Sequence, residues 1–280
     1  MRFTPVVSLL ILCSGFLAPL SAQSDSSSVY RLTLSDGSEF RGVVLSRDSS
    51  LVRFRSLGGV ELEIPQSSIA SLEEERGSWR EGRFLRHDPN QTRLFFAPTA
   101  RSLQTGDGYF SVYQIFFPMV AVGISDWLTI AGGLSLFPGT NSQLLYFAPK
   151  VQAVHTEHLD VSFGVLYLKI PEVDRGVGIS YGVLTAGNPR AAVTFGLGWG
   201  FIGEDFSDGP SIVIGGETQV SESVKLLSEN WIPAGSDLAI LSFGVRFFGE
   251  HLAGDFGLMT TTESGDGFPF IPWVGFVYNF

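Results

Sequence analysis

The chain has 280 residues, including 33 glycines and 24 phenylalanines, but charged residues make up only 16% of it. This composition is too apolar for a disordered chain and too rich in glycine for an ordinary helical core. The net charge of -10 argues against a nucleic-acid partner, because a surface that binds phosphates needs a basic patch.

The first 22 residues have the pattern of a secretory signal peptide. Arg2 supplies a positive charge, residues 6–20 are apolar, and Ala22 is a plausible cleavage site, to within a few positions. The only cysteine, Cys13, follows Leu12 and not a small residue, which disfavours lipid attachment. We therefore expect an exported protein whose mature chain needs no disulfide.

Residues 29–75 contain five short alternating segments separated by turn sequences such as "SDGS" and Gly58-Gly59. In the first segment, Tyr30, Leu32 and Leu34 share one face. This pattern predicts a small periplasmic β-domain of five strands. Its opening, residues 34–44 ("LSDGSEFRGVV"), resembles the small Sm-like and SH3-like barrels. The charged stretch of residues 76–91 has few apolar anchors, so we expect a linker there.

From residue 92 to the end, the segments are longer and alternate more regularly. In residues 191–201, Val193, Phe195 and Trp199 fall on one side, and Thr194 and Gly196 on the other. A large apolar face opposite a small or polar face is typical of a transmembrane β-barrel strand. A soluble β-sandwich would also alternate, but it would not require many long strands with a regular order of turns.

Twelve candidate strands can be counted in this part of the sequence. They begin near Thr92, Tyr109, Trp127, Gln143, Leu159, Gly176, Ala191, Pro210, Val224, Leu238, Leu252 and Ile271. The connections alternate between short ones, such as "SD", "HTEH", "NPR", "SES" and "GEH", and longer ones. Short periplasmic turns and longer outer loops are expected of such barrels, so both chain ends should be periplasmic.

The last ten residues, "IPWVGFVYNF", give the clearest likeness to a known family. A final strand with alternating aromatic residues and a C-terminal phenylalanine resembles the closing strand of bacterial outer-membrane β-barrel proteins. Val274, Phe276, Tyr278 and Phe280 match that pattern, and they should face lipid. The resemblance implies that the barrel assembly machinery reads this strand, and that the protein resides in the bacterial outer membrane.

Two short motifs suggest enzymes but lack the structure that those enzymes need. Gly198-x-Gly200-x-x-Gly203 matches a dinucleotide-binding loop, and Gly178-x-Ser180-x-Gly182 matches a nucleophile elbow, but each motif lies in a strand with no helix after it. We place Ser180 on the inward face of its strand. The four histidines lie in the linker or in expected periplasmic turns, away from arriving lipid or surface substrates. We expect no enzyme, no cofactor and no metal site.

Charged and amide residues share the inward parity of several strands. They are Lys150, Gln152, Glu217, Gln219, Lys225, Glu229, Arg246 and Asp255. Facing them to lipid would cost ~2–4 kcal/mol for a Lys or Arg at the midplane, so they should pair across the lumen. Two interpretations stay open, a structural ion network that fills the interior and a constriction that lines a pore.

The sequence therefore predicts an all-β protein: a small β-domain followed by an outer-membrane barrel of about twelve antiparallel strands. Our leading hypothesis is a narrow passive pore for small solutes. The alternative is a non-conducting barrel that anchors residues 29–75 for a periplasmic protein partner, and a lipid-acting enzyme comes third. The sequence does not identify the solute or the partner.

Overall fold

The computed structural model describes residues 28–280, apart from 76, 81–82, 140–141, 172 and 263–269. The expected signal peptide lies outside these residues. The described chain is built of β-strands and one short 3-10 turn, η2 (Gln66–Ser68). No helix in this part of the chain is long and apolar enough to span a membrane.

Five antiparallel strands form a sheet near the N-terminus. They are β1 (Val29–Leu34), β2 (Glu39–Arg47), β3 (Leu51–Ser56), β4 (Glu61–Pro65) and β5 (Ile69–Glu75). The order across the sheet is β4-β3-β2-β1-β5, so β1 lies between β2 and the last strand. Leu32, Val52, Phe54 and Ile64 form its buried core. All five strands that the alternation predicted are present.

A short hairpin of β6 (Gly77–Arg80) and β7 (Arg83–Arg86) lies in the stretch that we expected to be a linker. Phe84 and Leu85 in β7 are buried. The Arg86 amide donates to the Glu222 carbonyl of a barrel turn at 3.3 Å. This stretch therefore contacts the barrel through its backbone.

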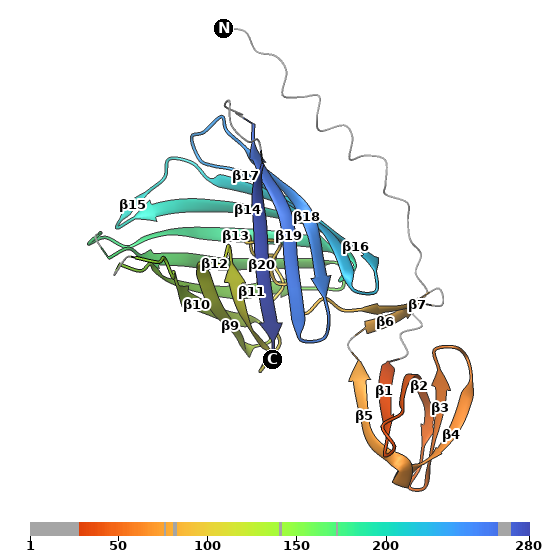
Figure 1. Cartoon of the computed structure of the whole chain (residues 1–280). Helices are drawn as coiled ribbons and strands as arrows, with labels where there is room; N and C mark the ends of the chain where they lie inside the picture. The colour runs from red at the N-terminus through yellow and green to blue at the C-terminus, as the bar shows by residue number, and fades with distance from the viewer. Residues whose placement is uncertain (1–27, 76, 81–82, 140–141, 172, 263–269) are drawn as a thin grey trace, which may run out of the picture.

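In the described part of the chain, twelve antiparallel strands form a closed barrel (Figure 1). They are β8 (Gly108–Tyr113), β9 (Phe117–Ser125), β10 (Leu128–Leu134), β11 (Leu145–His155), β12 (Leu159–Lys169), β13 (Val177–Gly187), β14 (Ala191–Ile202), β16 (Ser211–Ser221), β17 (Val224–Ile232), β18 (Ile240–Phe248), β19 (Leu252–Thr261) and β20 (Ile271–Asn279). Pairing of β20 with β8 closes the ring, which leaves no open sheet edge in lipid. The short β15 (Asp205–Phe206) extends β14 at a loop tip.

The strand expected to begin near Thr92 is absent, and that prediction was wrong. The stretch expected to form one strand from Tyr109 instead contains β8 and β9, joined by a three-residue turn at Gln114–Phe116. The count of twelve was correct because these two errors offset each other. The first loop is therefore this turn and not "TARSLQTGDG".

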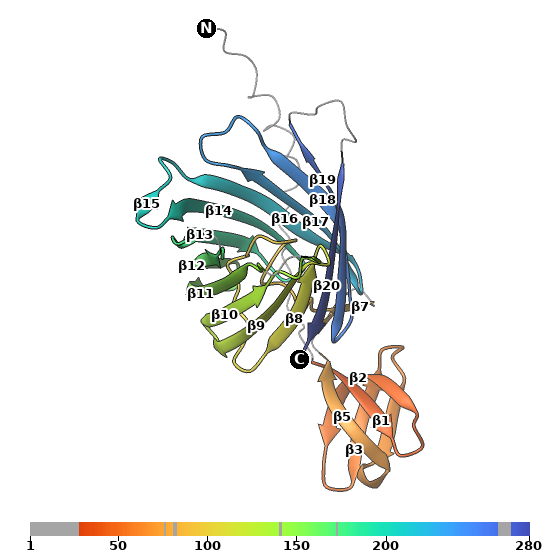
Figure 2. The same ribbon diagram turned by 60° about the vertical axis from the view of Figure 1, so that its left-hand side comes forward.

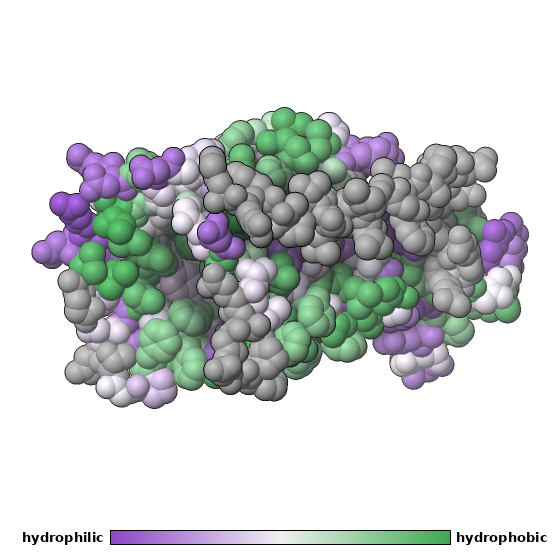
Figure 3. All heavy atoms as spheres, turned by 90° about the horizontal axis from the view of Figure 1, so that it is seen from above, coloured by the Kyte–Doolittle hydropathy of each residue, from purple (hydrophilic) through white to green (hydrophobic). Residues whose placement is uncertain are grey.

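The outer face of the barrel is apolar. On β20, Val274, Phe276, Tyr278 and Phe280 are all exposed, whereas the alternate residues from Trp273 to Asn279 are buried. Seen from above, hydrophobic side chains gather along the flank of the molecule and hydrophilic ones mostly toward its ends (Figure 3). The four aromatic and aliphatic residues of the closing strand face outward, as the sequence predicted.

Short and long connections alternate around the barrel. The even-numbered connections are all short, and among them are Thr156–His158, Glu222–Ser223 and Gly249–His251, whereas the odd-numbered ones are longer, apart from the first, Gln114–Phe116. The barrel ends near Gly108 and Phe280 lie at this same end, where the two residues exchange backbone hydrogen bonds of 2.8 and 2.9 Å. The five-stranded sheet lies beside this end in both ribbon views (Figures 1 and 2). We call it the short-turn end, and the opposite one the long-loop end.

Candidate functional site

Residues 88–103 fold inside the barrel, and we call this segment the plug. It turns back on itself through a bridge between Arg93 and Pro98, with the Leu94 amide donating to the Ala97 carbonyl at 2.9 Å. Its start contacts β20 through Asn90 and Asn279, and its end contacts β10 through the Thr129 hydroxyl. The plug therefore enters from the short-turn end, reaches into the lumen and returns to that end.

The barrel wall supplies the hydrogen bonds that the plug backbone lacks, since the plug belongs to no sheet. Lys150 Nζ donates to the carbonyls of Thr92, Thr99 and Arg101 at 3.1, 2.9 and 2.6 Å. Glu229 Oε2 accepts from the amides of Phe96 and Ala97 at 2.9 and 3.0 Å. One wall lysine thus satisfies carbonyls, and one wall glutamate satisfies amides.

A chain of alternating positive and negative side chains connects the plug to the wall. In order it runs Arg93, Asp255, Arg246, Asp88, Lys225, Glu217, Arg101 and Asp160. Its distances include 2.7 Å from Arg246 Nε to Asp255 Oδ1 and 2.9 Å from Arg246 Nη1 to Asp88 Oδ2. Asp88, Arg93 and Arg101 belong to the plug, so without the plug the wall charges would be buried without partners.

Asp88 shows how strongly this chain favours the ionised forms. Burial alone would raise the pKa of its carboxyl, but the charges of Arg246 and Lys225 and the Asn90 amide hold the pKa below its ordinary value. The Asp88 charge is therefore stable across the neutral range, and it fixes the start of the plug.

All eight inward residues expected from the sequence lie inside the barrel, but their partners differ from those expected. We expected pairing across the lumen, and the structure shows pairing mainly with the plug and with neighbouring strands. Gln152 Oε1 accepts from the Ser102 amide at 3.3 Å, and Gln219 Nε2 donates to the Arg86 carbonyl at 3.0 Å. The sequence identified the wall side of these contacts and missed the other side.

Wall glycines make room for the plug. A Cβ on Gly215 would approach Leu94 Cδ1 to 2.3 Å, and one on Gly257 would approach the Phe95 ring to 2.9 Å. A Cβ on Gly123 would meet the Gln104 carbonyl oxygen at 2.1 Å, where the chain leaves the plug for β8. Inward glycines in the sequence were therefore a signal for a packed segment in the lumen.

Beyond the plug, toward the long-loop end, lies a cavity of about 590 Å³, which we call the chamber. Most of its lining is apolar and comes from the long-loop ends of the strands. Examples are Tyr146, Leu166, Leu168, Tyr181, Ile240 and Met259. The lumen thus changes along its axis, from charged and filled at the short-turn end to apolar and hollow at the long-loop end.

The chamber corrects the expected facing of β13. Ile179 and Tyr181 line cavities inside the barrel, so the alternate residue Ser180 faces outward and not inward as we expected. Over this stretch the large side chains face the lumen and the alternate residues, Gly178, Ser180 and Gly182, are small, so the rule that large apolar residues face lipid selected the wrong face.

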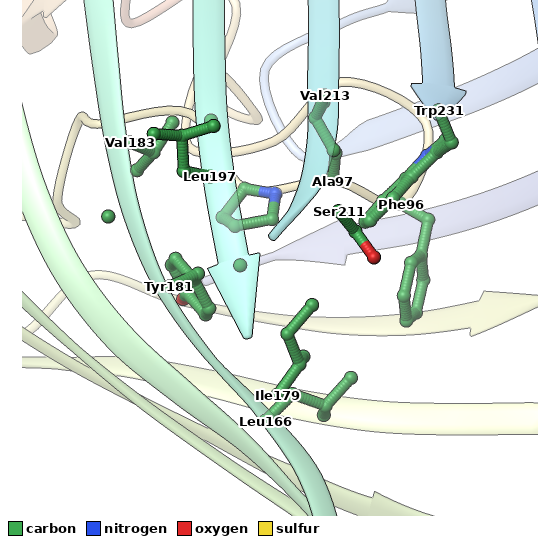
Figure 4. Close-up of a pocket in the computed structure, with 14 residues that line it drawn as sticks. Phe96, Ala97, Leu166, Ile179, Tyr181, Val183, Leu197, Ser211, Val213 and Trp231 are labelled. Atoms are coloured by element: carbon green, nitrogen blue, oxygen red, sulfur yellow. The ribbon is translucent and has the colours of Figure 1, made fainter. Parts of the chain in front are cut away.

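A smaller cavity of about 50 Å³ lies between the plug and the wall of β12, β13, β14 and β16. Leu166, Ile179 and Val213 line it from the wall, and Phe96 and Ala97 from the plug (Figure 4). It shares Phe96, Leu166 and other residues with the chamber. The tip of the plug therefore forms part of an apolar surface that continues along the wall.

A closed antiparallel barrel with an apolar outer face suits lipid, because every strand is paired and the exposed side chains are hydrophobic. The fold is that of a bacterial outer-membrane β-barrel.

No protein-family model and no curated protein matches the chain. Among solved structures, it is similar to the KdgM porin in complex with disordered oligogalacturonate, with TM-score 0.48, 8% identity, and coverage of 62% of this chain and 98% of that one. It is also similar to Omp33 of Acinetobacter baumannii, with TM-score 0.37, 8% identity and coverage of 62% and 95%. A loop-deletion form of OmpT of Vibrio cholerae gives TM-score 0.35, 12% identity and coverage of 91% and 97%. These likenesses are too distant to support an argument about solute or activity.

Proposed function

We propose that the protein is an outer-membrane barrel through which small solutes pass along a route that the plug keeps narrow. The observation that carries this proposal is the division of the lumen into a hollow chamber and a filled half. The filling segment is held by hydrogen bonds and ion pairs, and these can be exchanged when the plug shifts. Displacement or ordering of a segment is one of the ways in which proteins switch between two states, and the plug would gate the lumen in this way.

The orientation follows from the turns. Short connections are periplasmic in barrels of this kind, so the plug and the five-stranded sheet would lie toward the periplasm, and the chamber toward the outside. A solute would then enter the chamber first and meet the tip of the plug at Phe96. A barrel of twelve strands is wider than an eight-stranded barrel, which side chains fill, and narrower than a sixteen-stranded porin, which leaves an open channel. The passage should therefore be narrow even when the plug is displaced.

Conductance across planar bilayers tests this function. The full protein should give small or infrequent steps, because the plug fills the lumen at rest. Lys150→Met removes one charged donor from three plug carbonyls, and it should raise the open fraction about ten- to hundredfold, the equivalent of a lost charged hydrogen bond.

The matched control is Lys169→Met, because Lys169 is exposed near a long loop and its ammonium group donates to the Val173 carbonyl at 3.4 Å, away from the plug. This variant should conduct like the unaltered protein. Silence of both the unaltered protein and Lys150→Met, at every voltage and salt concentration, would overturn the pore.

A second candidate function has its own observation. The five-stranded sheet contacts the short-turn end of the barrel through ion pairs, Arg31 with Glu250 at 2.9 Å and Arg41 with Glu222 at 3.5 Å. In this proposal the sheet is a periplasmic domain that binds a protein partner while the barrel anchors it. Deletion of residues 29–75 should then remove a co-purifying protein without loss of the barrel, and an unchanged set of co-purifying proteins would exclude the anchoring role.

Assembly is a further part of the proposal. The closing strand, with Val274, Phe276, Tyr278 and Phe280 on its lipid face, would be read by the barrel assembly machinery after export by the signal peptide of residues 1–22. Its outward aromatic residues and its terminal pairing with β8 support this role.

A further inference from the structure

Among the described residues, four that line the chamber have buried polar atoms without a hydrogen-bond partner, namely Thr92, Arg93, Tyr113 and Trp273. Arg93 and Trp273 differ from the two hydroxyl residues because their side chains can only donate. Arg93 uses Nη1 for Asp255, Leu94 and Phe95, but its Nε and Nη2 have no hydrogen-bond partner, although the side chain is only 3% exposed. Trp273 Nε1 is likewise buried and without a partner. Buried donors in native proteins are nearly always satisfied, so an acceptor is missing from this place.

The two donors meet at one wall of the chamber. The Arg93 guanidinium lies 5.2 Å from the centroid of the Tyr113 ring, and the Trp273 ring lies 6.1 Å from it. All three residues line the chamber. The side chains of Arg93 and Trp273 therefore flank the same tyrosine ring at one part of the chamber wall.

The other charged groups of the chamber lining are engaged. Lys150 donates to three carbonyls, and Glu229 accepts from two amides and from Trp231 Nε1 at 2.7 Å. Asp255, which pairs with Arg93, also pairs with Arg246. Arg93 therefore ends the ion chain and shares one carboxylate with Arg246, and two of its N–H groups stay without an acceptor at the wall of the chamber.

The rest of the chamber is apolar and of the size of a small-molecule site. Its 590 Å³ lies within the ~300–1,000 Å³ range of ligand pockets, and such pockets combine apolar walls with a few oriented polar groups. Met259, Leu168 and the continuing surface past Phe96 could cover a hydrocarbon chain, but they could not solvate a sugar.

We propose that the chamber binds a carboxylate amphiphile, with its anionic head on Arg93 and Trp273 and its hydrocarbon chain against the apolar wall. Two parallel N–H groups of a guanidinium match the two oxygens of a carboxylate, and the indole N–H adds a third donor. This ligand would be the class of solute that the proposed pore transports. Binding in the chamber does not depend on the proposed function, and only the route by which the solute leaves rests on it.

Equilibrium binding to the full protein in lipid nanodiscs tests the site, with empty nanodiscs as the blank for partition into lipid. The probes are decanoate, 1-decanol and decyltrimethylammonium, which share a chain and differ in head-group charge. Decanoate should bind saturably at one site per barrel. The alcohol should bind about tenfold or more weakly, because it lacks the charge-assisted bonds, and the cation should not bind saturably.

Three variants locate the site. Arg93→Met should weaken decanoate binding about ten- to hundredfold and leave the alcohol nearly unchanged, and Trp273→Phe should weaken decanoate about three- to tenfold. Because Arg93 also holds the plug, a third variant avoids it. Ala148→Phe fills the chamber from β11 and should abolish binding of both decanoate and 1-decanol. Val151→Phe, on the lipid face of the same strand, should leave the affinity for both probes unchanged.

Equal saturable binding of all three probes would overturn the carboxylate head group, and so would decanoate affinity that Trp273→Phe and Ala148→Phe leave unchanged. Absence of saturable decanoate binding would mean that water alone satisfies these donors. These readouts do not use conductance, so a silent pore with intact decanoate binding would refute the proposed function and keep the site.

Discussion

The ion chain predicts that Arg246→Met releases the plug without opening the barrel. Arg246 is fully buried and donates to Asp255, to Asp88, and to the carbonyls of Asn90 and Leu94. Removing one partner of a buried pair costs ~3–5 kcal/mol. In the variant, Asp255 still pairs with Arg93, and Asp88 still pairs with Lys225. We therefore expect a cost at the lower end of this range, about 3 kcal/mol, which makes the population of molecules with a released plug roughly a hundredfold larger.

Hydrogen exchange followed by mass spectrometry measures this release directly. Peptides from residues 88–103 should exchange about a hundredfold faster in Arg246→Met, while peptides from the barrel strands keep their protection, because the strand ladders do not depend on the plug. Arg175→Met is the control, because its pair with Asp205 at 3.2 Å is mostly exposed and such pairs contribute ~0–1 kcal/mol. Unchanged protection of the plug would refute the role of the chain, and equal loss in plug and barrel would show that the two unfold together.

Three other changes have defined outcomes. Gly123→Ala forces a Cβ against the Gln104 carbonyl, so it should lower the midpoint of thermal unfolding, with overpacking costing ~1–3 kcal/mol, and Gly200→Ala, which has open space, should not. The hydrogen bond from Arg31 lowers the pKa of Glu250 in the folded protein. Attachment of the N-terminal sheet to the barrel should therefore be complete above about pH 4.3 and should weaken as the pH falls through the lower pKa of the folded state. Glu250→Gln should abolish this pH dependence, which can be measured by proteolysis between sheet and barrel. Phe280→Ser should reduce the heat-modifiable barrel band in outer-membrane fractions far more than total exported protein, and normal barrel levels would contradict the assembly signal.

Period-two alternation was enough to predict a closed antiparallel barrel. β14 has large apolar residues on its outer face and small or polar ones on its inner face, and lipid gives that contrast a physical reason. The turns "NPR" and "GEH" were also correctly located, because proline, glycine and charge interrupt the alternation there. These features depend on neighbours along the chain, which a sequence displays directly.

The plug could not be separated from a strand by the same reasoning. Leu94, Phe95 and Ala97 are buried and lie next to polar residues that bind the wall, so the local string resembles the first strand of a barrel. Its true partners, such as Glu229 and Asp255, lie more than 130 positions away. Only the inward glycines pointed to a segment in the lumen, and small inward residues are also typical of any transmembrane β-barrel strand.

The inward side chains of the barrel change from charged to apolar along its axis, and this one change accounts for both the plug and the chamber. Inward residues near the short-turn end are charged, like Lys225 and Arg246, because each serves a charge or a backbone group of the plug. Inward residues near the long-loop end, like Leu168 and Met259, meet no plug and are free to be apolar. Arg93 lies where these two regions meet, and its Nε and Nη2 have no acceptor among the described residues. A segment that only blocked the lumen would need the Arg93 Nη1 contacts with Asp255, Leu94 and Phe95 but not the two further donors, and this supports the proposal that the boundary between plug and chamber is shaped for an anionic head group.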